Sequence, residues 1–288
     1  MIAVLSKDAP LRHKAAVVRL AEDAGLTVHV SDTPGYCLIG VVGEGAEALA
    51  DPISKLDGVV EVDLSAPAYA LVSRAHRPVS SRVRVGDAEF GDGGVHVIAG
   101  PCSVEGLEQI LTAAHAVKAA GACALRGGAY KPRTSPYAFQ GLGAEGLELL
   151  SQAREATGLP VVTEVLDLRD LERVAESADV MQVGARNMQN YALLRELGGV
   201  RRTVLLKRGM AGTLDELLHA AEYIVSNGNP NVILCERGVR THISHARATL
   251  DLAAIAVLKE RTHLPVIVDP SHAAGRRALV GPLALAAV

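Results

Sequence analysis

Short apolar stretches recur at a steady interval from about residue 95 of this 288-residue chain, and amphipathic segments of helical spacing separate them. Continuous apolar runs of this length are typical of strands buried on both faces, as in a parallel sheet. The alternation predicts seven β/α units, arranged as a doubly wound sheet or a (β/α)8 barrel. The predicted strands are Val95–Ala99, Ala122–Leu125, Val161–Thr163, Met181–Val183, Val204–Leu206, Val232–Leu234 and Val266–Val268.

The residues that follow these strands favour the barrel. Each strand runs into a charged or metal-binding side chain, and in a barrel all these strand ends meet at one mouth, where barrel enzymes hold their active sites. A dinucleotide-binding sheet is disfavoured, because no GxGxxG turn follows the first strand. The side chains at the strand ends are Cys102, Arg126, Glu164, Arg186, Lys207, Glu236 with Arg237, and Asp269 with His272.

A closed (β/α)8 barrel needs an eighth strand, which this sequence does not show. After the seventh predicted strand there is one helical segment, Arg276–Ala287, and the sequence ends at Val288. An open sheet edge exposes unpaired backbone groups. We therefore expect the native chain to continue beyond Val288, and the alternative is an edge-open form with seven units.

Residues 1–75 form a separate unit with the order βαββαβ, which is the ferredoxin-like arrangement. A linker is predicted at Arg74–Val79, and a barrel domain that is incomplete at its C-terminal end is predicted over 80–288, beginning with a short hairpin within 83–93. The expected strands of the first unit are 1–5, 27–31, 36–43 and 58–65, the expected helices are Pro10–Gly25 and Ala46–Leu56, and a turn is expected at Asp32–Gly35.

Composition excludes several classes of protein. The formal net charge of -3 and the low aromatic content (3%) disfavour nucleic-acid binding. No apolar run approaches the length of a membrane span, and the N-terminus lacks the pattern of a secretion signal. The four cysteines (Cys37, Cys102, Cys123 and Cys235) show no CxxC spacing, so we expect reduced thiols and a cytoplasmic protein.

The stretch LRGGAYKPRTSPYAFQGLG (125–143) has neither helical nor strand periodicity, and a loop of this length inside a domain is typically functional or disordered. It places Arg126, Lys131 and Arg133 beside Thr134 and Ser135, a combination common in phosphate sites. Further cations are expected at the same mouth. The sequence thus predicts a site for small, multiply charged anions, to which Arg186, Lys207, Arg208 and Arg237 also contribute.

Cys102 and His272 are candidate metal ligands, because they follow the first and last predicted strands. A thiolate and an imidazole together favour zinc, iron, manganese or a similar divalent ion. Two ligands are too few for a tight site, and Cys102 could equally be a structural cysteine. His245 and His263 are interpreted as surface or core histidines.

Six motifs closely resemble those of the 3-deoxy-D-arabino-heptulosonate 7-phosphate (DAHP) synthase family. They are AGPCSVE (99–105), RGGAYKPRTSPYAFQGLG (126–143), QVGARNMQN (182–190), LLKRGM (205–210), ILCERGVR (233–240) and DPSHAAG (269–275). The resemblance runs from about residue 80 onward, and residues 1–75 resemble the regulatory domain of some members. It implies condensation of phosphoenolpyruvate with erythrose 4-phosphate, which releases inorganic phosphate and is the first step of the shikimate pathway to aromatic amino acids.

The resemblance also implies a role for individual residues. Lys131, Glu164 and His272 would be catalytic, with Lys131 as a proton donor and Glu164 orienting water at C2. Cys102 and His272 would hold a divalent ion (Mn, Fe, Zn, Co or similar), while the family's glutamate and aspartate ligands have no counterpart after His272. Arg133, Thr134 and Ser135 would bind erythrose 4-phosphate, and phosphoenolpyruvate would be bound by Arg126, Lys131, Ala185, Arg186, Lys207 and Arg237.

Further expectations concern regulation and alternatives. The resemblance implies a homo-oligomer, a tetramer in relatives, with feedback inhibition by an aromatic amino acid, and a chorismate mutase as a conceivable partner. No nucleic-acid or membrane partner is expected. The alternative functions are a 3-deoxy-octulosonate 8-phosphate synthase-like enzyme and a non-catalytic amino-acid-sensing or scaffold protein.

Overall fold

The computed structural model describes residues 1–6, 8–32, 36–64 and 69–288. It contains two compact units, one formed by Met1–Ser80 with Glu260–His263 and the other by Ser81–Lys259 with Leu264–Val288. The turn expected at Asp32–Gly35 lies, apart from Asp32, outside the described residues.

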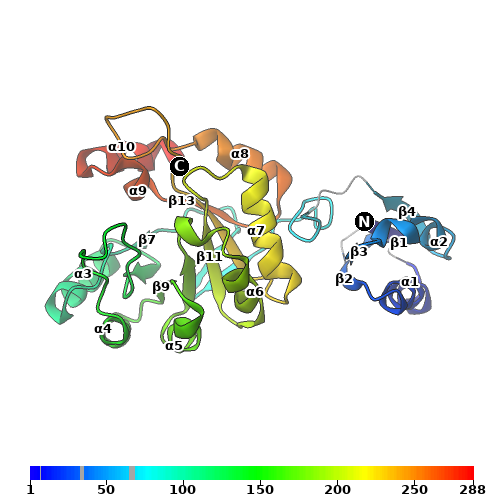
Figure 1. The fold of residues 1–288 in the computed structure, drawn as a ribbon, viewed down its shortest axis with the longest axis horizontal. Helices are drawn as coiled ribbons and strands as arrows, with labels where there is room; N and C mark the ends of the chain where they lie inside the picture. The colour runs from blue at the N-terminus through cyan, green and yellow to red at the C-terminus, as the bar shows by residue number, and fades with distance from the viewer. Residues whose placement is uncertain (7, 33–35, 65–68) are drawn as a thin grey trace. The chain divides into compact units, whose positions relative to one another are not determined.

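The first unit has the ferredoxin-like fold that its sequence predicts, drawn in blue in Figure 1. Its sheet has the antiparallel order β2-β3-β1-β4, and its core lies between the sheet and the helices. The elements are β1 (Ile2–Ser6), α1 (Leu11–Asp23), β2 (Thr27–Asp32), β3 (Tyr36–Val42), the 3-10 helix η1 (Ala46–Leu49), α2 (Ala50–Ser54) and β4 (Val59–Asp63).

The segment expected to be a linker is folded onto its own unit. Ser73 forms an antiparallel bridge with Thr262, and the backbone N–H of Arg74 donates to the carbonyl of Arg261 at 2.9 Å. His76 is buried at 6% exposure. These contacts satisfy backbone groups that an extended linker would leave to solvent.

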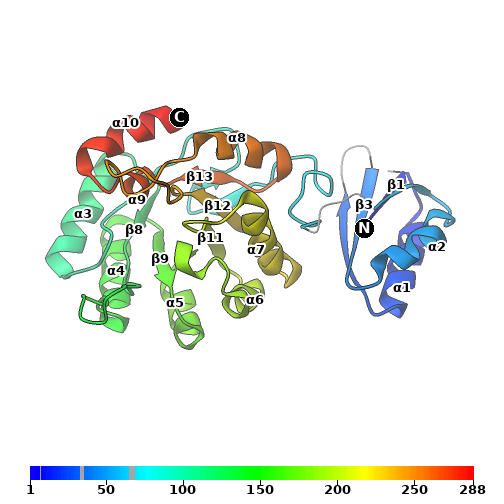
Figure 2. The ribbon, with the colours of Figure 1, turned by 45° about the horizontal axis from the view of Figure 1, so that its top comes forward.

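The second unit contains the parallel sheet predicted from the apolar repeats, in the order β13-β12-β11-β10-β9-β8-β7. The sheet curls, and helices cover its outer face (Figure 2). The strands are β7 (Ile98–Ala99), β8 (Ala124–Arg126), β9 (Val161–Val165), β10 (Val180–Val183), β11 (Thr203–Lys207), β12 (Val232–Glu236) and β13 (Val266–Val268). The first strand begins later than predicted, at Ile98, and Val95 and Val97 before it are more than half exposed.

The connections between these strands supply the outer helices. Thr213 begins α7 with a reciprocal capping box, in which its side chain and that of Glu216 each accept from the other's backbone N–H. The helical elements are α3 (Leu107–Ala119), α4 (Ala144–Thr157), η2 (Leu168–Asp170), α5 (Leu171–Ser177), η3 (Ala185–Asn187), α6 (Tyr191–Gly199), α7 (Leu214–Ser226), α8 (Leu252–Arg261), α9 (Pro270–Ala274) and α10 (Arg277–Ala287).

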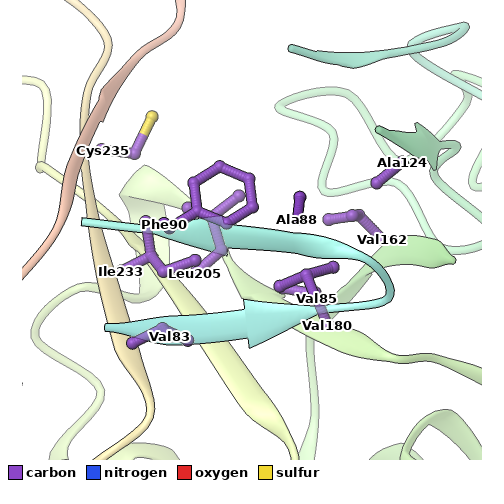
Figure 3. Close-up of a cluster of buried hydrophobic side chains, with 10 residues drawn as sticks. All are labelled: Val83, Val85, Ala88, Phe90, Ala124, Val162, Val180, Leu205, Ile233 and Cys235. Atoms are coloured by element: carbon purple, nitrogen blue, oxygen red, sulfur yellow. The ribbon is translucent and has the colours of Figure 1, made fainter. Parts of the chain in front are cut away.

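A hairpin fills the inside of the curled sheet. Strands β5 (Val83–Val85) and β6 (Ala88–Phe90) pair as the sequence predicts. Their four inward side chains pack against Ala124, Val162, Val180, Leu205, Ile233 and Cys235, which come from five consecutive strands (Figure 3). Since Ala124 and Val180 begin their strands, the hairpin packs beside strand amino ends and leaves the carboxyl ends open to a site.

Three expectations about the chain as a whole can be compared with the structure. The four cysteines are all free thiols, as their spacing indicates. None of the helices in the described parts of the chain is both long and apolar enough to span a membrane. Within the residues the structure describes, the sheet has seven strands, with β7 and β13 at its two edges.

Candidate active site

A cavity of about 370 Å³ opens at the carboxyl ends of the parallel strands. Parallel strands bring their carboxyl ends to one edge, so residues distant in sequence become neighbours there. All twelve residues to which the family resemblance gives a role line this cavity: Cys102, Arg126, Lys131, Arg133, Thr134, Ser135, Glu164, Ala185, Arg186, Lys207, Arg237 and His272.

Local structure places each of these side chains at the mouth. Arg126 and Lys207 are the last residues of β8 and β11, and Glu164 is the penultimate residue of β9. Arg186 lies in η3, a single 3-10 turn directly after β10. A charged residue at such a position is held by its strand while its side chain reaches the cavity.

The irregular loop after β8 folds back on itself. The N–H of Lys131 donates to the carbonyl of Gln140 at 2.8 Å, and Nε of Arg133 donates to the carbonyl of Phe139 at 3.0 Å. Gly128 is required for a close approach, because a Cβ there would lie 2.7 Å from the Cys102 oxygen and 2.9 Å from Cδ of Lys131. The loop is thus a shaped part of the site.

Lys131 connects this loop to Cys102. Its ammonium group donates to the carbonyl oxygen of Cys102 at 2.7 Å and to the thiol sulfur at 3.2 Å. On the other side of the sulfur, Nε2 of His272 lies 3.6 Å away. The hydrogen bond with His272 lowers the pKa of the Cys102 thiol, and burial opposes this effect. The charge of Lys131 lowers the pKa further, so that it is about 5. The thiolate is therefore the expected form at neutral pH.

Asp269 organises the opposite wall. Its side chain caps α9 by accepting from the backbone N–H of His272 at 2.9 Å, and it also accepts from Nδ1 of His272 at 2.5 Å and from Nζ of Lys207. Burial would raise the pKa of this carboxyl, but the hydrogen bonds and charges of His272 and Lys207 hold it well below its usual range. An ionised carboxylate only accepts, so the Nδ1 proton points to Asp269 and Nε2 faces Cys102.

These contacts fit a pair of metal ligands. A thiolate of low pKa next to an imidazole nitrogen, with the other ring nitrogen anchored by a carboxylate, is a donor set suited to zinc, iron or manganese. No group of three or more potential metal-ligating side chains occurs among residues 1–6, 8–32, 36–64 and 69–288. Cys102 and His272 therefore fit as two positions of a coordination shell.

Glu164 is held in one orientation beneath the cavity. Nε2 of Gln182 donates to its Oε2 at 3.2 Å, and a Cβ at Gly184 would lie 1.9 Å from its Oε1. The carboxyl is 8% exposed, and burial raises its pKa in spite of the opposing charges of Lys131 and Lys207. Such a group is suited to bind and polarise a water molecule.

Most cations of the cavity lack a carboxylate partner. Among the cations that line the cavity in the described part of the chain, only Lys207 forms an ion pair with a carboxylate, that of Asp269. The others donate to backbone carbonyls or the thiol, or make no side-chain hydrogen bond, as for Arg186. The positive charge of the mouth is therefore available to a ligand.

Arg208 does not line the cavity. The prediction that it contributes to the anion site at the mouth is therefore wrong. It is 7% exposed and lies beside the cavity, where NH1 donates to Glu236 at 2.8 Å and to Asp251 at 3.0 Å. Glu236 is fully buried and also accepts from the N–H of Gly238 at 2.5 Å. The residue after Lys207 points away from the mouth, as alternation along a strand requires.

Several residues at the site escape the sequence analysis. Gln182 and Gly184 position Glu164, and Arg247 lines the cavity from the long connection after β12. Asp269 is expected at a strand end, but its role as the anchor of His272 is not. Gln182 lies two residues before Gly184 within the motif QVGARNMQN, so its alternation along β10 could have indicated it. No local pattern marks Arg247.

Both units match known families. Residues 75–288 match the family described as "DAHP synthetase I family", and residues 1–63 match the "DAHP synthase ferredoxin-like domain". The phospho-2-dehydro-3-deoxyheptonate aldolase of Thermotoga maritima is 47% identical over 288 residues, which cover 100% of this chain and 85% of that protein. The 2-dehydro-3-deoxyphosphooctonate aldolase of Methylobacterium radiotolerans is 33% identical, over 72% of this chain and 79% of its own length.

Solved structures show the same similarity. The crystal structure of a phospho-2-dehydro-3-deoxyheptonate aldolase (DAHP synthase) from Thermotoga maritima has a TM-score of 0.76 and 46% identity, covering 99% of this chain and 84% of that one. A truncated form of the 3-deoxy-D-arabino-heptulosonate 7-phosphate synthase from the same organism has a TM-score of 0.70 and 48% identity, covering 76% of this chain and 81% of that one.

Proposed function

The chain belongs to the DAHP synthetase I family, and we propose that it condenses phosphoenolpyruvate with erythrose 4-phosphate to give DAHP and inorganic phosphate. The observation that carries this proposal is the convergence of the twelve site residues on one cavity whose cations are largely unpaired. Two phosphorylated substrates repel each other, and a cavity rich in available positive charge offsets that repulsion while it orients both.

The two ends of phosphoenolpyruvate require different partners. We assign its phosphate to Arg186, Arg237 and the backbone of Ala185, and its carboxylate to Arg126, Lys131 and Lys207. Arginine forks match phosphate geometry, and the N–H groups at the start of η3 add dipoles of the favourable sign. Arg133, Thr134 and Ser135, on the loop after β8, would take the phosphate of erythrose 4-phosphate.

The reaction forms one carbon–carbon bond and one bond between C2 and a water oxygen, and it breaks the bond between C2 and the phosphate oxygen. C3 of phosphoenolpyruvate attacks the aldehyde carbon, and Lys131 donates a proton to the aldehyde oxygen as it becomes a hydroxyl. The positive charge left at C2 is captured by water that Glu164 orients, and the water gives a proton to the Lys131 amine that the first step left neutral. The resulting hemiketal phosphate breaks the bond between C2 and the phosphate oxygen and expels inorganic phosphate. The neighbouring arginines stabilise the negative charge that builds on the phosphate.

Metal dependence is part of the proposal, and Cys102 and His272, which line the same cavity as the substrate-binding residues, would hold the ion. When bound there, such an ion supplies Lewis-acid polarisation of a carbonyl. Asp269 fixes the orientation of His272, and Lys131 stabilises the Cys102 thiolate. These contacts support the two residues as ligands, with manganese, iron, zinc and cobalt as the candidate ions.

The test measures inorganic phosphate release from phosphoenolpyruvate with each of two aldehydes, in the presence of added divalent ions. Erythrose 4-phosphate should support turnover and arabinose 5-phosphate should not. Turnover with arabinose 5-phosphate alone would identify an octulosonate 8-phosphate synthase, the activity named for the more distant relatives. No phosphate release with either aldehyde would refute a catalytic role.

Regulation through the ferredoxin-like unit is also proposed. Residues 1–63 match a domain described specifically for DAHP synthases. We propose that this unit binds an aromatic amino acid, an end product, in a homo-oligomer, a tetramer by resemblance. A chorismate mutase would be a suitable partner, because its substrate lies downstream in the same pathway.

A further inference from the structure

The connection between β12 and α8 is a small hairpin with a fixed base. Val239 and Thr249 form an antiparallel bridge, in which each N–H donates to the other's carbonyl at 2.9 Å. The hydroxyl groups of Thr241 and Thr249 lie 2.6 Å apart, and the N–H of Arg240 donates to the carbonyl of Met210 at 2.7 Å. This hairpin carries one side chain into the cavity, that of Arg247.

The hairpin is docked onto α9, the helix that carries His272. The N–H of Arg247 donates to the carbonyl of Ala274 at 3.2 Å, and that of Ala248 donates to Ala273 at 2.9 Å. Gly275 permits this approach, because it has φ +66° and a Cβ there would lie 2.7 Å from Cβ of Arg247. The backbone of Arg247 is therefore held by the same short helix that positions His272.

Among the residues that the structure describes, no carboxylate pairs with the guanidinium of Arg247. Across the described ranges it forms no ion pair and no side-chain hydrogen bond, although it lines the cavity with Arg237 and His272. It is close enough to Arg237 to affect it electrostatically. Burial lowers the pKa of Arg237, whereas the charge of Asp269 raises it. The positive charge of Arg247 also lowers the pKa of Arg237. Two guanidinium groups that line one cavity, neither with an ion-pair partner in the described part of the chain, offer a site for an anion with a double charge.

We propose that Arg247 is a further substrate-binding residue, which binds the phosphate of phosphoenolpyruvate together with Arg237. Phosphoenolpyruvate fits better than erythrose 4-phosphate, because Arg247 adjoins Arg237, whereas the residues assigned to the sugar phosphate lie on the loop after β8. The inference rests on the proposed function for the identity of the substrate. Kinetic and binding measurements together distinguish failure of the inference from failure of the proposed function.

The test compares the wild type with Arg247→Ala and Arg247→Lys in steady-state kinetics and in calorimetric titration with phosphoenolpyruvate. A charge-assisted contact at a half-open rim is worth about 1.4 kcal/mol, so Arg247→Ala should raise the KM and Kd for phosphoenolpyruvate roughly tenfold. The KM for erythrose 4-phosphate should stay within about twofold. The KM and Kd of Arg247→Lys for phosphoenolpyruvate should lie between those of the wild type and Arg247→Ala, because lysine keeps the charge but cannot form the two parallel hydrogen bonds of a guanidinium.

His242→Ala is the control on the same hairpin, since His242 is exposed and lines neither this cavity nor the neighbouring one that Arg240 lines with Ala185 and Arg186. It should leave both KM values unchanged. Wild-type affinity for phosphoenolpyruvate in both Arg247 variants would overturn the inference, and so would a rise confined to the KM for erythrose 4-phosphate. If the wild type shows no turnover, the proposed function fails, while the titration still decides whether Arg247 binds phosphoenolpyruvate. Lysine retains the stem that packs on Gly275, so that variant keeps the test valid if the alanine variant unfolds.

Discussion

Nε2 of His272 lies 3.6 Å from Sγ of Cys102, although 170 positions separate the two residues in the sequence. The first and last regions of the parallel sheet bring the two residues together. Lys131 donates a hydrogen bond to Cys102, and Asp269 accepts one from His272. A reactive thiol and an oriented imidazole are thereby placed where all the predicted substrate-binding cations meet.

The first prediction concerns the Cys102 thiol. Because its pKa is lowered to about 5, the thiolate should predominate above that pH in protein stripped of metal ions. Alkylation by iodoacetamide should reach half its maximal rate near pH 5. Burial raises the pKa of Cys123 and that of Cys235, so these thiols should not react below pH 8. A Cys102→Ser variant should lose the reaction, and a midpoint near pH 9 would contradict the geometry.

The second prediction concerns Asp269. Its folded-state pKa is lowered, so its contribution to stability is present above the unfolded pKa and disappears as pH falls through the folded value. Asp269→Asn leaves Lys207 buried without a carboxylate, which should cost about 3 kcal/mol at pH 7. Thermal unfolding is measured at several values from pH 7 to pH 3. The difference in Tm between the wild type and the variant should become smaller as the pH falls. A difference that is constant with pH would argue against this carboxylate as its source.

The third prediction concerns Gly184. An added methyl group at Gly184→Ala would lie 1.9 Å from Oε1 of Glu164, so that carboxylate must move. A displacement of this size should lower kcat about 100-fold while the variant remains folded. Gly199→Ala is the control, because nothing lies within 4 Å of a Cβ at that position. Equal activities of the two variants, measured by phosphate release, would remove the role given to Glu164.

The fourth prediction concerns the buried ion pairs of Arg208. Arg208→Ala leaves the fully buried Glu236 without its cation, which should lower the free energy of unfolding by about 3–5 kcal/mol. Urea unfolding measures this loss directly. Arg169→Ala is the control, since that arginine pairs with Asp167 on the exposed surface and should change stability little. If both variants unfold at the same urea concentration, Glu236 does not depend on Arg208.

The fifth prediction concerns the ferredoxin-like unit. Inhibition by tyrosine or phenylalanine should disappear when residues 1–75 are deleted, because the proposed effector site lies in that unit. Phosphate release by the full chain and the shortened chain, with and without each amino acid, tests this. Equal inhibition of both forms would place any effector site in the barrel domain.

Much of the architecture could be predicted because its signals are local. The apolar repeats marked the strands of the parallel sheet to within a few residues, and the βαββαβ order marked the first unit. A side chain at or just beyond the end of a buried parallel strand lies near the carboxyl edge of the sheet, which is why residues such as Glu164, Lys207 and His272 could be selected from the sequence alone.

The partners of these side chains are not local, and only the tertiary structure determined them. Arg208 and Lys207 are adjacent cations, yet Lys207 faces the cavity while Arg208 pairs with Glu236 and Asp251. Arg247 reaches the site only because its hairpin docks on α9. Periodicity along the sequence determines which face of its own helix or strand a residue occupies. The partners of a side chain depend on how separate elements pack against one another, and that packing is a property of the whole fold.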